Sequence, residues 1–133
     1  MPKKTNYVYA VGRRKEAVAR VRLFAGKGEN TVNGVSIEKY FSGEIAKEVY
    51  LLPFRVIDAE KSFFVSAKVL GGGKESQLQA VSSGIAKTLA KAKADFRSPL
   101  KKLGLLTRDA RIRQRRMVGM GGKSRRKRQS PKR

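Results

Sequence analysis

Residues 61–94, KSFFVSAKVLGGGKESQLQAVSSGIAKTLAKAKA, decide the fold of this chain. Apolar residues alternate with other residues over 61–70, and a period of two is typical of a strand that buries one face. Three glycines at 71–73 end this strand. From 76 to 94, apolar residues recur every three or four positions, which predicts an amphipathic helix packed against the sheet. Gly84 is unfavourable inside a helix, so we expect it to mark a close approach to the sheet.

A second alternating stretch lies upstream, at residues 17–24, AVARVRLF. The odd-numbered residues fall on one face of the strand, whereas Arg20 and Arg22 fall on the other. The pattern therefore predicts a half-buried strand whose outer face carries two arginines. The Tyr- and Val-rich residues 6–11 predict another strand, and residues 12–15, GRRK, predict a basic turn after it.

Turn and helix signals complete the body of the protein. Asn33-Gly34 is a strong hairpin signal, because both central positions of that turn need a positive φ. Pro53 is expected to interrupt the helical pattern before it. Short helices are expected over 36–41, 44–52 and 99–103. Together these elements predict an α+β fold, a single domain in which packed helices cover a sheet of about four strands.

The end of the chain has a different composition. Residues 101–133 hold 14 Lys and Arg against one acid, Asp109, whose natural partner is a neighbouring arginine. No aromatic residue follows Phe96. Such a segment lacks the apolar area that would offset the entropy of ordering it, and its charges repel one another. We therefore divide the chain into a globular body, 1–104, and an extended basic tail, 105–133.

The whole chain carries a net charge of +22 and contains no cysteine. A charge of this size favours a nucleic-acid partner over a membrane surface, because the basic tail is not amphipathic. The missing cysteines exclude disulfides and thiolate metal sites, and no apolar run is long enough to span a membrane. The first residues show no signal-peptide pattern, so we expect the protein to stay where it is made.

Catalytic and cofactor sites are not indicated. The chain has no His and no Cys, and its ten acids form no paired-carboxylate or magnesium pattern. The segments Gly122-Lys123-Ser124 and Gly71 to Lys74 each lack residues that a nucleotide-binding loop needs. We therefore expect no enzyme, no catalytic residue, no metal and no cofactor. The helix after Gly73 could hold an RNA phosphate at its N-terminus, or the glycines could be a purely structural turn.

Three groups of cations are candidate nucleic-acid contacts. The first group is either a phosphate-contact patch or a solvated sheet face. It comprises Arg13, Arg14, Lys15, Arg20 and Arg22. Lys87, Lys91 and Lys93 either contact RNA or complement the C-terminal dipole of their helix. The third group is the arginine-rich tail, which suits bidentate phosphate contacts and stacking on bases. RNA is favoured over DNA, because no helix-turn-helix, zinc finger or heptad array is present.

Several segments are distinctive in their order and spacing. They are YAVGRRKEAVARVR at 9–22, Val32 to Gly34 followed by Tyr40-Phe41, GGGKESQ at 71–77 with SGIAK at 83–87, LTRDAR at 106–111 with Arg116, and the terminal Lys132-Arg133. Together they cover essentially the whole chain, and they resemble the family of small-subunit ribosomal protein nine, of the bacterial or organellar type.

The resemblance implies a structural role in the head of the small ribosomal subunit. The body would be similar to the second domain of ribosomal protein five, with a βαβ crossover of left hand. It would bind head rRNA beside neighbouring head proteins, and the tail would reach the tRNA in the peptidyl site. No membrane or small-molecule substrate is implied. The location implied is the ribosome, in a bacterial cytoplasm or in an organelle that encodes its own copy.

Carried over residue by residue, the resemblance implies that Lys132 and Arg133 contact the backbone of the tRNA anticodon stem-loop. The implied rRNA path is lined by cations of the tail: Arg108, Arg111, Arg113, Arg115, Arg116, Lys123, Arg125, Arg126, Lys127 and Arg128. The tail ends QSPKR, whereas the family commonly has an aromatic residue and then Ser-Lys-Arg. Pro131 fixes φ near −65° at this point, so a stacking contact at the tip is in question, whereas the terminal charges remain.

Two other functions stay open at this level. An architectural DNA-binding protein would bind duplex DNA with an affinity comparable to its affinity for RNA, but the sequence lacks the dimerisation or wedge features of such proteins. An RNA-processing enzyme would need a general base or a carboxylate cluster, and the sequence supplies neither. In every case binding should weaken steeply as salt rises, because phosphate neutralisation releases counterions.

Overall fold

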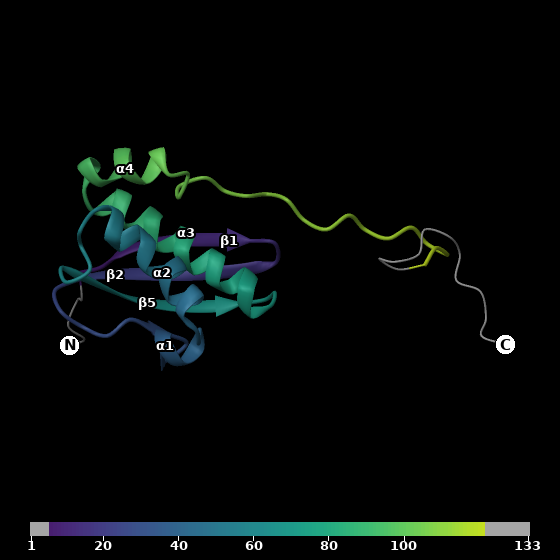
Figure 1. Cartoon of the computed structure of the whole chain (residues 1–133), viewed down its shortest axis with the longest axis horizontal. Coiled ribbons are helices and arrows are strands. Elements are labelled where there is room, and N and C mark those ends of the chain that lie inside the picture. The colour runs from purple at the N-terminus through teal and green to yellow at the C-terminus, as the bar shows by residue number, and fades with distance from the viewer. Residues whose placement is uncertain (1–5, 122–133) are drawn as a thin grey trace.

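Five strands form one mixed sheet in the computed structural model, which describes residues 6–121 (Figure 1). The strands are β1 (Val8–Arg14), β2 (Ala17–Ala25), β3 (Thr31–Val32), β4 (Val35–Ser36) and β5 (Phe63–Leu70), in the spatial order β1-β2-β5-β3-β4. The sheet has one strand more than the four that the sequence predicts. The two shortest strands form the hairpin at Asn33-Gly34, where φ is 52° and 81°, so both residues have the positive values that the turn requires.

Strand directions define one βαβ unit. β1, β2 and β5 pair antiparallel, whereas β3 runs parallel to β5, with Thr31 opposite Ser66 and Val32 opposite Ala67. The connection from β3 to β5 contains β4 and the helices α1 (Ile37–Tyr40) and α2 (Glu44–Val56). The α+β class predicted from the sequence is therefore confirmed, and it includes a crossover between parallel strands.

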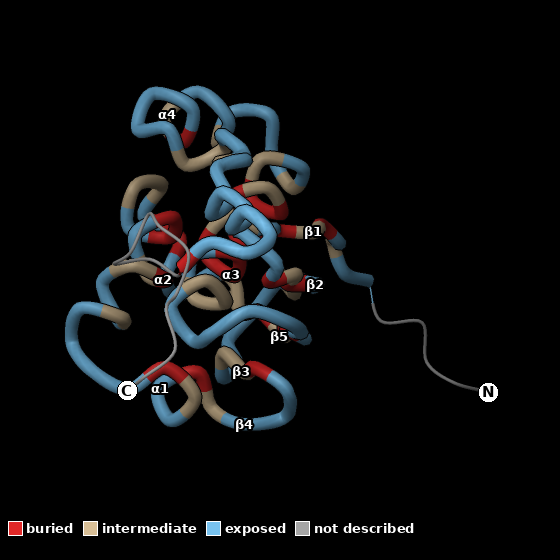
Figure 2. The backbone as a smooth tube through the Cα atoms, turned by 90° about the vertical axis from the view of Figure 1, so that its right-hand side faces the viewer, coloured by how far each residue is buried: buried red, intermediate tan, exposed pale blue. Residues whose placement is uncertain are grey.

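Helices cover one face of the sheet. The longest, α3 (Lys74–Ala92), contacts β1 and β2, and α2 packs beside it (Figures 1 and 2). A 3-10 turn, η1 (Ala94–Phe96), and the short helix α4 (Arg97–Lys102) follow. Among the helices of residues 6–121, none has the length and hydropathy that would let it cross a membrane.

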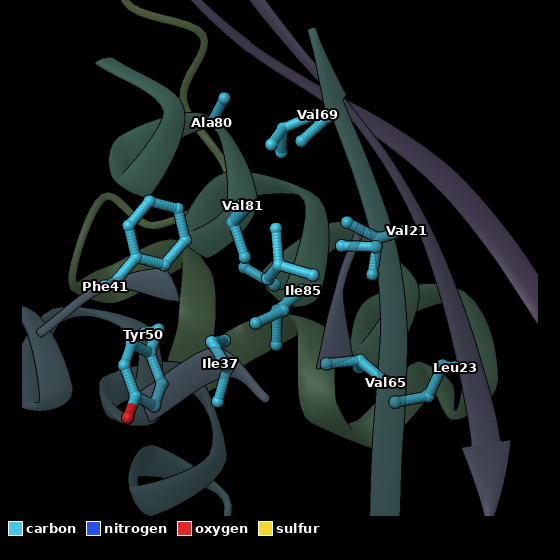
Figure 3. Close-up of a cluster of buried hydrophobic side chains, with 14 of the residues drawn as sticks. Val21, Leu23, Ile37, Phe41, Tyr50, Val65, Val69, Ala80, Val81 and Ile85 are labelled. Atoms are coloured by element: carbon cyan, nitrogen blue, oxygen red, sulfur yellow. The ribbon is translucent and has the colours of Figure 1, made fainter. Parts of the chain in front are cut away.

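The core lies between the covered sheet face and α2 and α3. Figure 3 shows Val21 and Val65 of the sheet turned toward Ile85 of α3, as the alternation of β2 and β5 predicts. Phe41 and Tyr50 close the core on the side of α1 and α2. The Tyr50 hydroxyl is buried and has no hydrogen-bond partner among the described residues. Burial raises the pKa of Tyr50, and the negative charge of Glu38 raises it further.

The prediction that Gly84 marks a close approach is confirmed. A Cβ at Gly84 would lie 2.5 Å from Cγ2 of Val21, and one at Gly12 would overlap the carbonyl oxygen of Ala80. The backbones of α3 and β1 therefore meet glycine to glycine. The turn predicted at residues 12–15 begins later than expected, which agrees with the same contact. Gly12 continues β1 to Arg14, and the chain turns only at Lys15, whose φ is 52°.

The prediction that Pro53 ends its helix is also wrong, because α2 continues through Pro53 to Val56. Proline has no N–H, so it cannot donate to the carbonyl of Val49, one helical turn earlier. The Ser82 hydroxyl of α3 donates to that carbonyl instead, at 3.2 Å. Helix packing thus supplies the hydrogen bond that the local sequence removes.

Candidate nucleic-acid interface

The sheet face opposite the helices is open and carries cations. Arg20 and Arg22 of β2 are exposed there, which confirms the outer face predicted from the alternation. Lys68 of β5 lies directly across from Arg20 and is exposed too. Arg13, near the end of β1, pairs with Val18 and lies on the same face. Lys15 is exposed in the turn between these strands.

Arg14 is placed differently from its neighbours. Its Nε donates to Oε1 of Gln79 in α3 at 2.7 Å, on the covered side of the sheet, and only 15% of its side chain is exposed. Its Nη1 donates to the carbonyl oxygen of Arg111 at 2.9 Å and lies 3.4 Å from Oδ1 of Asp109. The structure therefore brings Arg13, Arg20 and Arg22 together on one face and turns Arg14 toward the beginning of the tail.

Asp109 pairs with an arginine, as the sequence predicts. Nη2 of Arg111 lies 2.8 Å from Oδ2 of Asp109, and the backbone N–H of Arg111 donates to Oδ1 at 3.0 Å. These bonds from Arg111, with Arg14 nearby, hold the pKa of the Asp109 carboxyl well below its usual range. The same pairing raises the pKa of the Arg111 guanidinium. The segment around residue 109 is thus attached to the body through Arg14, a contact that sequence patterns give no means of finding.

Two lysines of α3 lie at the free edge of β1. Lys87 Nζ donates to the Val11 carbonyl oxygen at 3.3 Å, and Lys91 Nζ donates to the Tyr9 carbonyl oxygen at 3.0 Å. β1 is the first strand in the sheet order, and within residues 6–121 its only strand partner is β2. These contacts favour a structural role for the two lysines over an RNA contact. The third lysine, Lys93, lies with Nζ 5.4 Å from the ring centroid of Phe96.

The beginning of the tail leaves the body as an irregular segment. Leu105 and Leu106 still pack against the core, whereas residues 107–117 contain no helix or strand and run away from the body (Figure 1). The arginines of this stretch are exposed, and Arg113, Arg115 and Arg116 have no ion pair within the described part of the chain. The predicted contacts Lys123, Arg125, Arg126, Lys127, Arg128, Lys132 and Arg133 lie outside the described residues.

Three acidic side chains that form ion pairs lie on the helical side of the molecule. Glu38, Glu48 and Glu60 lie in or beside α1 and α2, where Lys47 and Arg55 pair with them at 3.0–3.9 Å. No group of three His, Cys, Asp or Glu residues within 6–121 could hold a metal ion. The open sheet face therefore carries positive charge that the acids of the described residues do not neutralise. This arrangement suits a polyanion.

An exposed cationic sheet face followed by an arginine-rich segment defines a class of protein, the basic α+β proteins that bind polyanions. Comparison with known proteins is more specific: the model of the family described as ribosomal protein S9/S16 matches residues 12–133. The chain belongs to this family. It is accordingly a ribosomal protein of the small-subunit type that acts in translation, a structural protein and not an enzyme.

Individual relatives agree with the family assignment. The chain is 47% identical over 111 residues to the small ribosomal subunit protein uS9 of Thermus thermophilus. The matched region covers 84% of this chain and 87% of the relative. It is 42% identical over 112 residues to the protein of the same name from an Anaeromyxobacter strain, covering 84% and 86%. A third uS9, from Saccharopolyspora erythraea, is 42% identical over 113 residues, covering 85% and 74%.

Proposed function

We propose that this protein is a structural constituent of the head of the small ribosomal subunit, where it binds rRNA and where its tail contacts the tRNA in the peptidyl site. One observation carries the proposal: within residues 6–121, cations that form no ion pair are exposed both on the open sheet face and along residues 113–116. A ligand that touches both cationic regions must be a large polyanion, and a folded rRNA meets this requirement.

The proposed rRNA contacts fall into two sets. On the body they are Arg13, Lys15, Arg20 and Arg22, and in the tail they are the arginines and lysines of residues 108–128. Arg14 belongs to the body set by sequence, but its bonds to Gln79 and Arg111 weigh against a phosphate contact through the same guanidinium. Lys132 and Arg133 are proposed to contact tRNA, and the support for them is the family membership together with their charge.

Two structural features belong to the same proposal. We propose that the crossover from β3 to β5 is left-handed and that residues 105–133 act as one basic arm inserted into rRNA. The parallel pairing of β3 with β5 supports the crossover itself, and family membership supports its left hand. The irregular, exposed course of residues 107–117 supports the arm. We also propose that the protein works on bacterial ribosomes in the cytoplasm, since the relatives named above are bacterial.

The proposed tRNA contact can be tested by removing the two terminal charges. We expect that Lys132→Ala with Arg133→Ala leaves small subunits assembled but makes tRNA dissociate from the peptidyl site roughly tenfold faster, because charge-assisted hydrogen bonds to phosphate are lost. The measurement is the tRNA dissociation rate on purified small subunits. A matched control, Lys101→Ala with Lys102→Ala, removes equal charge from α4 and should leave the rate unchanged. An unchanged rate in the tail variant would exclude the tRNA role.

The broader assignment is tested by sedimentation of a cell lysate at moderate and high salt. The proposal predicts that the protein migrates with small subunits and intact ribosomes at both salt concentrations. A DNA-binding protein would instead be found with the chromosome. Recovery in the chromosomal or unbound fractions at both concentrations would contradict the rRNA assignment.

A further inference from the structure

The open sheet face carries aromatic rings as well as cations. Tyr7, which precedes β1, is 44% exposed, and Tyr9 within β1 is 41% exposed. Beside them on the same face, Phe24 and Phe64 stack with ring centroids 5.1 Å apart and planes 15° apart, and the ring of Tyr7 packs against that of Phe24 at 5.8 Å. The two phenylalanines support a surface on which the tyrosine rings remain accessible to solvent.

Cations alternate with these rings across the strands. Tyr9 lies opposite Arg22, which lies opposite Ser66 on the next strand, and Arg20 lies opposite Lys68 one row further along. The guanidinium carbon of Arg22 is 5.0 Å from the centroid of the Tyr7 ring, a cation–π contact that orients the arginine side chain. The ring of Tyr9 has no such contact among the described residues and is the ring that remains free for a ligand.

A hollow of about 430 Å³ lies in this surface. It is lined by Tyr7, Tyr9, Arg20, Arg22, Ser66 and Lys68. No acidic side chain lines it, and its three cations form no ion pair within residues 6–121. The lining thus combines two tyrosine rings, the hydroxyl of Ser66 and three positive charges that no acid of the described residues neutralises.

We propose that this hollow binds an unpaired RNA base, stacked on Tyr9, with the flanking phosphates held by Arg20, Arg22 and Lys68. The proposal rests on the proposed rRNA binding and assigns the open sheet face a way of contacting RNA that charge alone does not give. Aromatic rings beside cations are the usual platform for single-stranded nucleic acid. A base inside a duplex is stacked on its neighbours and cannot present its face to Tyr9. The ligand is therefore a loop, bulge or single strand.

The first experiment separates the aromatic ring from its surroundings with two variants of one residue. Tyr9→Phe keeps the ring and Tyr9→Leu removes it, and neither changes the charge. Full-length proteins are titrated with a 12-nucleotide single-stranded RNA at high salt, where the cationic tail contributes least. We expect Tyr9→Phe to bind like the unmodified protein and Tyr9→Leu to bind roughly 5- to 100-fold more weakly, as stacking on one ring predicts. Equal affinities of the two variants would overturn the proposal.

Salt dependence distinguishes stacking from charge. Tyr9→Leu should leave the log–log slope of affinity against salt unchanged, whereas Arg20→Gln should lower it by roughly 0.7, the value for one phosphate contact on a single strand. A duplex of the same sequence should bind both Tyr9 variants equally, because its bases cannot reach the ring. If Tyr9→Leu weakened duplex binding as much as single-strand binding, the side chain would have a general structural effect and the proposal would fail.

The second experiment places the contact in the ribosome. Small subunits are irradiated with ultraviolet light, digested with trypsin and nuclease, and examined by mass spectrometry for an RNA adduct on the peptide of residues 5–13, which contains Tyr9. An adduct on Tyr9 supports the proposal. Subunits that contain the protein but give no adduct on this peptide would contradict the base-stacking site alone. Absence of the protein from the subunits would contradict the proposed function itself, so the two failures are distinguishable.

Discussion

At the scale of single residues, glycine has two different uses in this protein that composition does not distinguish. Asn33-Gly34 is a turn with positive φ at both positions, as its dipeptide predicts. Gly12 and Gly84 are instead places where the strand and helix backbones touch, since a Cβ on either would overlap neighbouring atoms. The helical setting of Gly84 indicates this in advance. Gly12 stands beside three basic residues, and that context favours a turn beginning at Gly12, whereas the structure continues β1 to Arg14 and turns at Lys15.

The glycine contact predicts the effect of adding one methyl group. We expect Gly84→Ala to lower the free energy of unfolding by roughly 1–3 kcal/mol, because overpacking against Val21 outweighs the gain of up to about 1 kcal/mol in helix propensity. Urea denaturation of the two proteins measures the difference. Gly73→Ala adds a methyl group where no atom lies within 4 Å, so any loss in that variant reflects only the weaker N-cap preference of alanine. A Gly84→Ala protein at least as stable as the unmodified protein would show that the contact can relax without loss of stability.

At the scale of elements, the sequence predicts faces better than it predicts ends. The alternation in β2 and β5 assigns every residue to the covered or open face correctly, because the period of two follows from backbone geometry. The extent of α2 was not predictable, because Pro53 is compensated by Ser82, a residue of another helix. The Arg14 contact with Asp109 is equally hidden, since it joins residues that only the tertiary structure brings together.

The compensation in α2 can be measured as an interaction between two residues. Ser82→Ala should lower the free energy of unfolding by about 0.5–1.5 kcal/mol, because the part-buried hydrogen bond to the carbonyl of Val49 is lost. Pro53→Ala restores an N–H to that carbonyl within the helix. Ser82→Ala should therefore lower the free energy of unfolding less in a protein that already carries Pro53→Ala than in the unmodified protein. A double-mutant cycle measures this difference, and strictly additive effects would show that the hydroxyl does not compensate for the proline.

At the scale of the whole molecule, charge is segregated. Within residues 6–121, the ion pairs of Glu38, Glu48 and Glu60 lie on the α1 and α2 side, whereas the cations of the open sheet face and of residues 113–116 form no ion pair. The net charge of +22 predicts a polyanionic partner from composition alone. The fold determines which cations can contact that partner. Arg14, Lys87 and Lys91 already donate hydrogen bonds to backbone carbonyl oxygens of the protein.

This segregation predicts which charges contribute to RNA affinity. The triple change of Arg113, Arg115 and Arg116 to Gln should lower the log–log slope of rRNA affinity against salt by roughly 2–3, if each arginine neutralises one phosphate. The change of Lys87 and Lys91 to Gln should leave the slope nearly unchanged, because these lysines bind carbonyls of β1. Affinity measured for an rRNA fragment over a range of salt concentrations gives both slopes. If the Lys87 and Lys91 variant lowered the slope more than the triple arginine variant did, the assignment of RNA contacts to the tail arginines would be wrong.

The lysines over β1 have a further consequence for the time before the protein meets RNA. A sheet has two edges, and an uncovered edge can add a strand from another copy and begin an aggregate. One edge here is β4, which has only two residues, and the other is β1, where Lys87 and Lys91 occupy carbonyls of Tyr9 and Val11 that an incoming strand would need. We therefore expect that newly synthesised copies of the chain do not pair strand to strand through β1. The two lysine–carbonyl hydrogen bonds that attach α3 to β1 should thus also keep the unbound protein monomeric until it meets RNA.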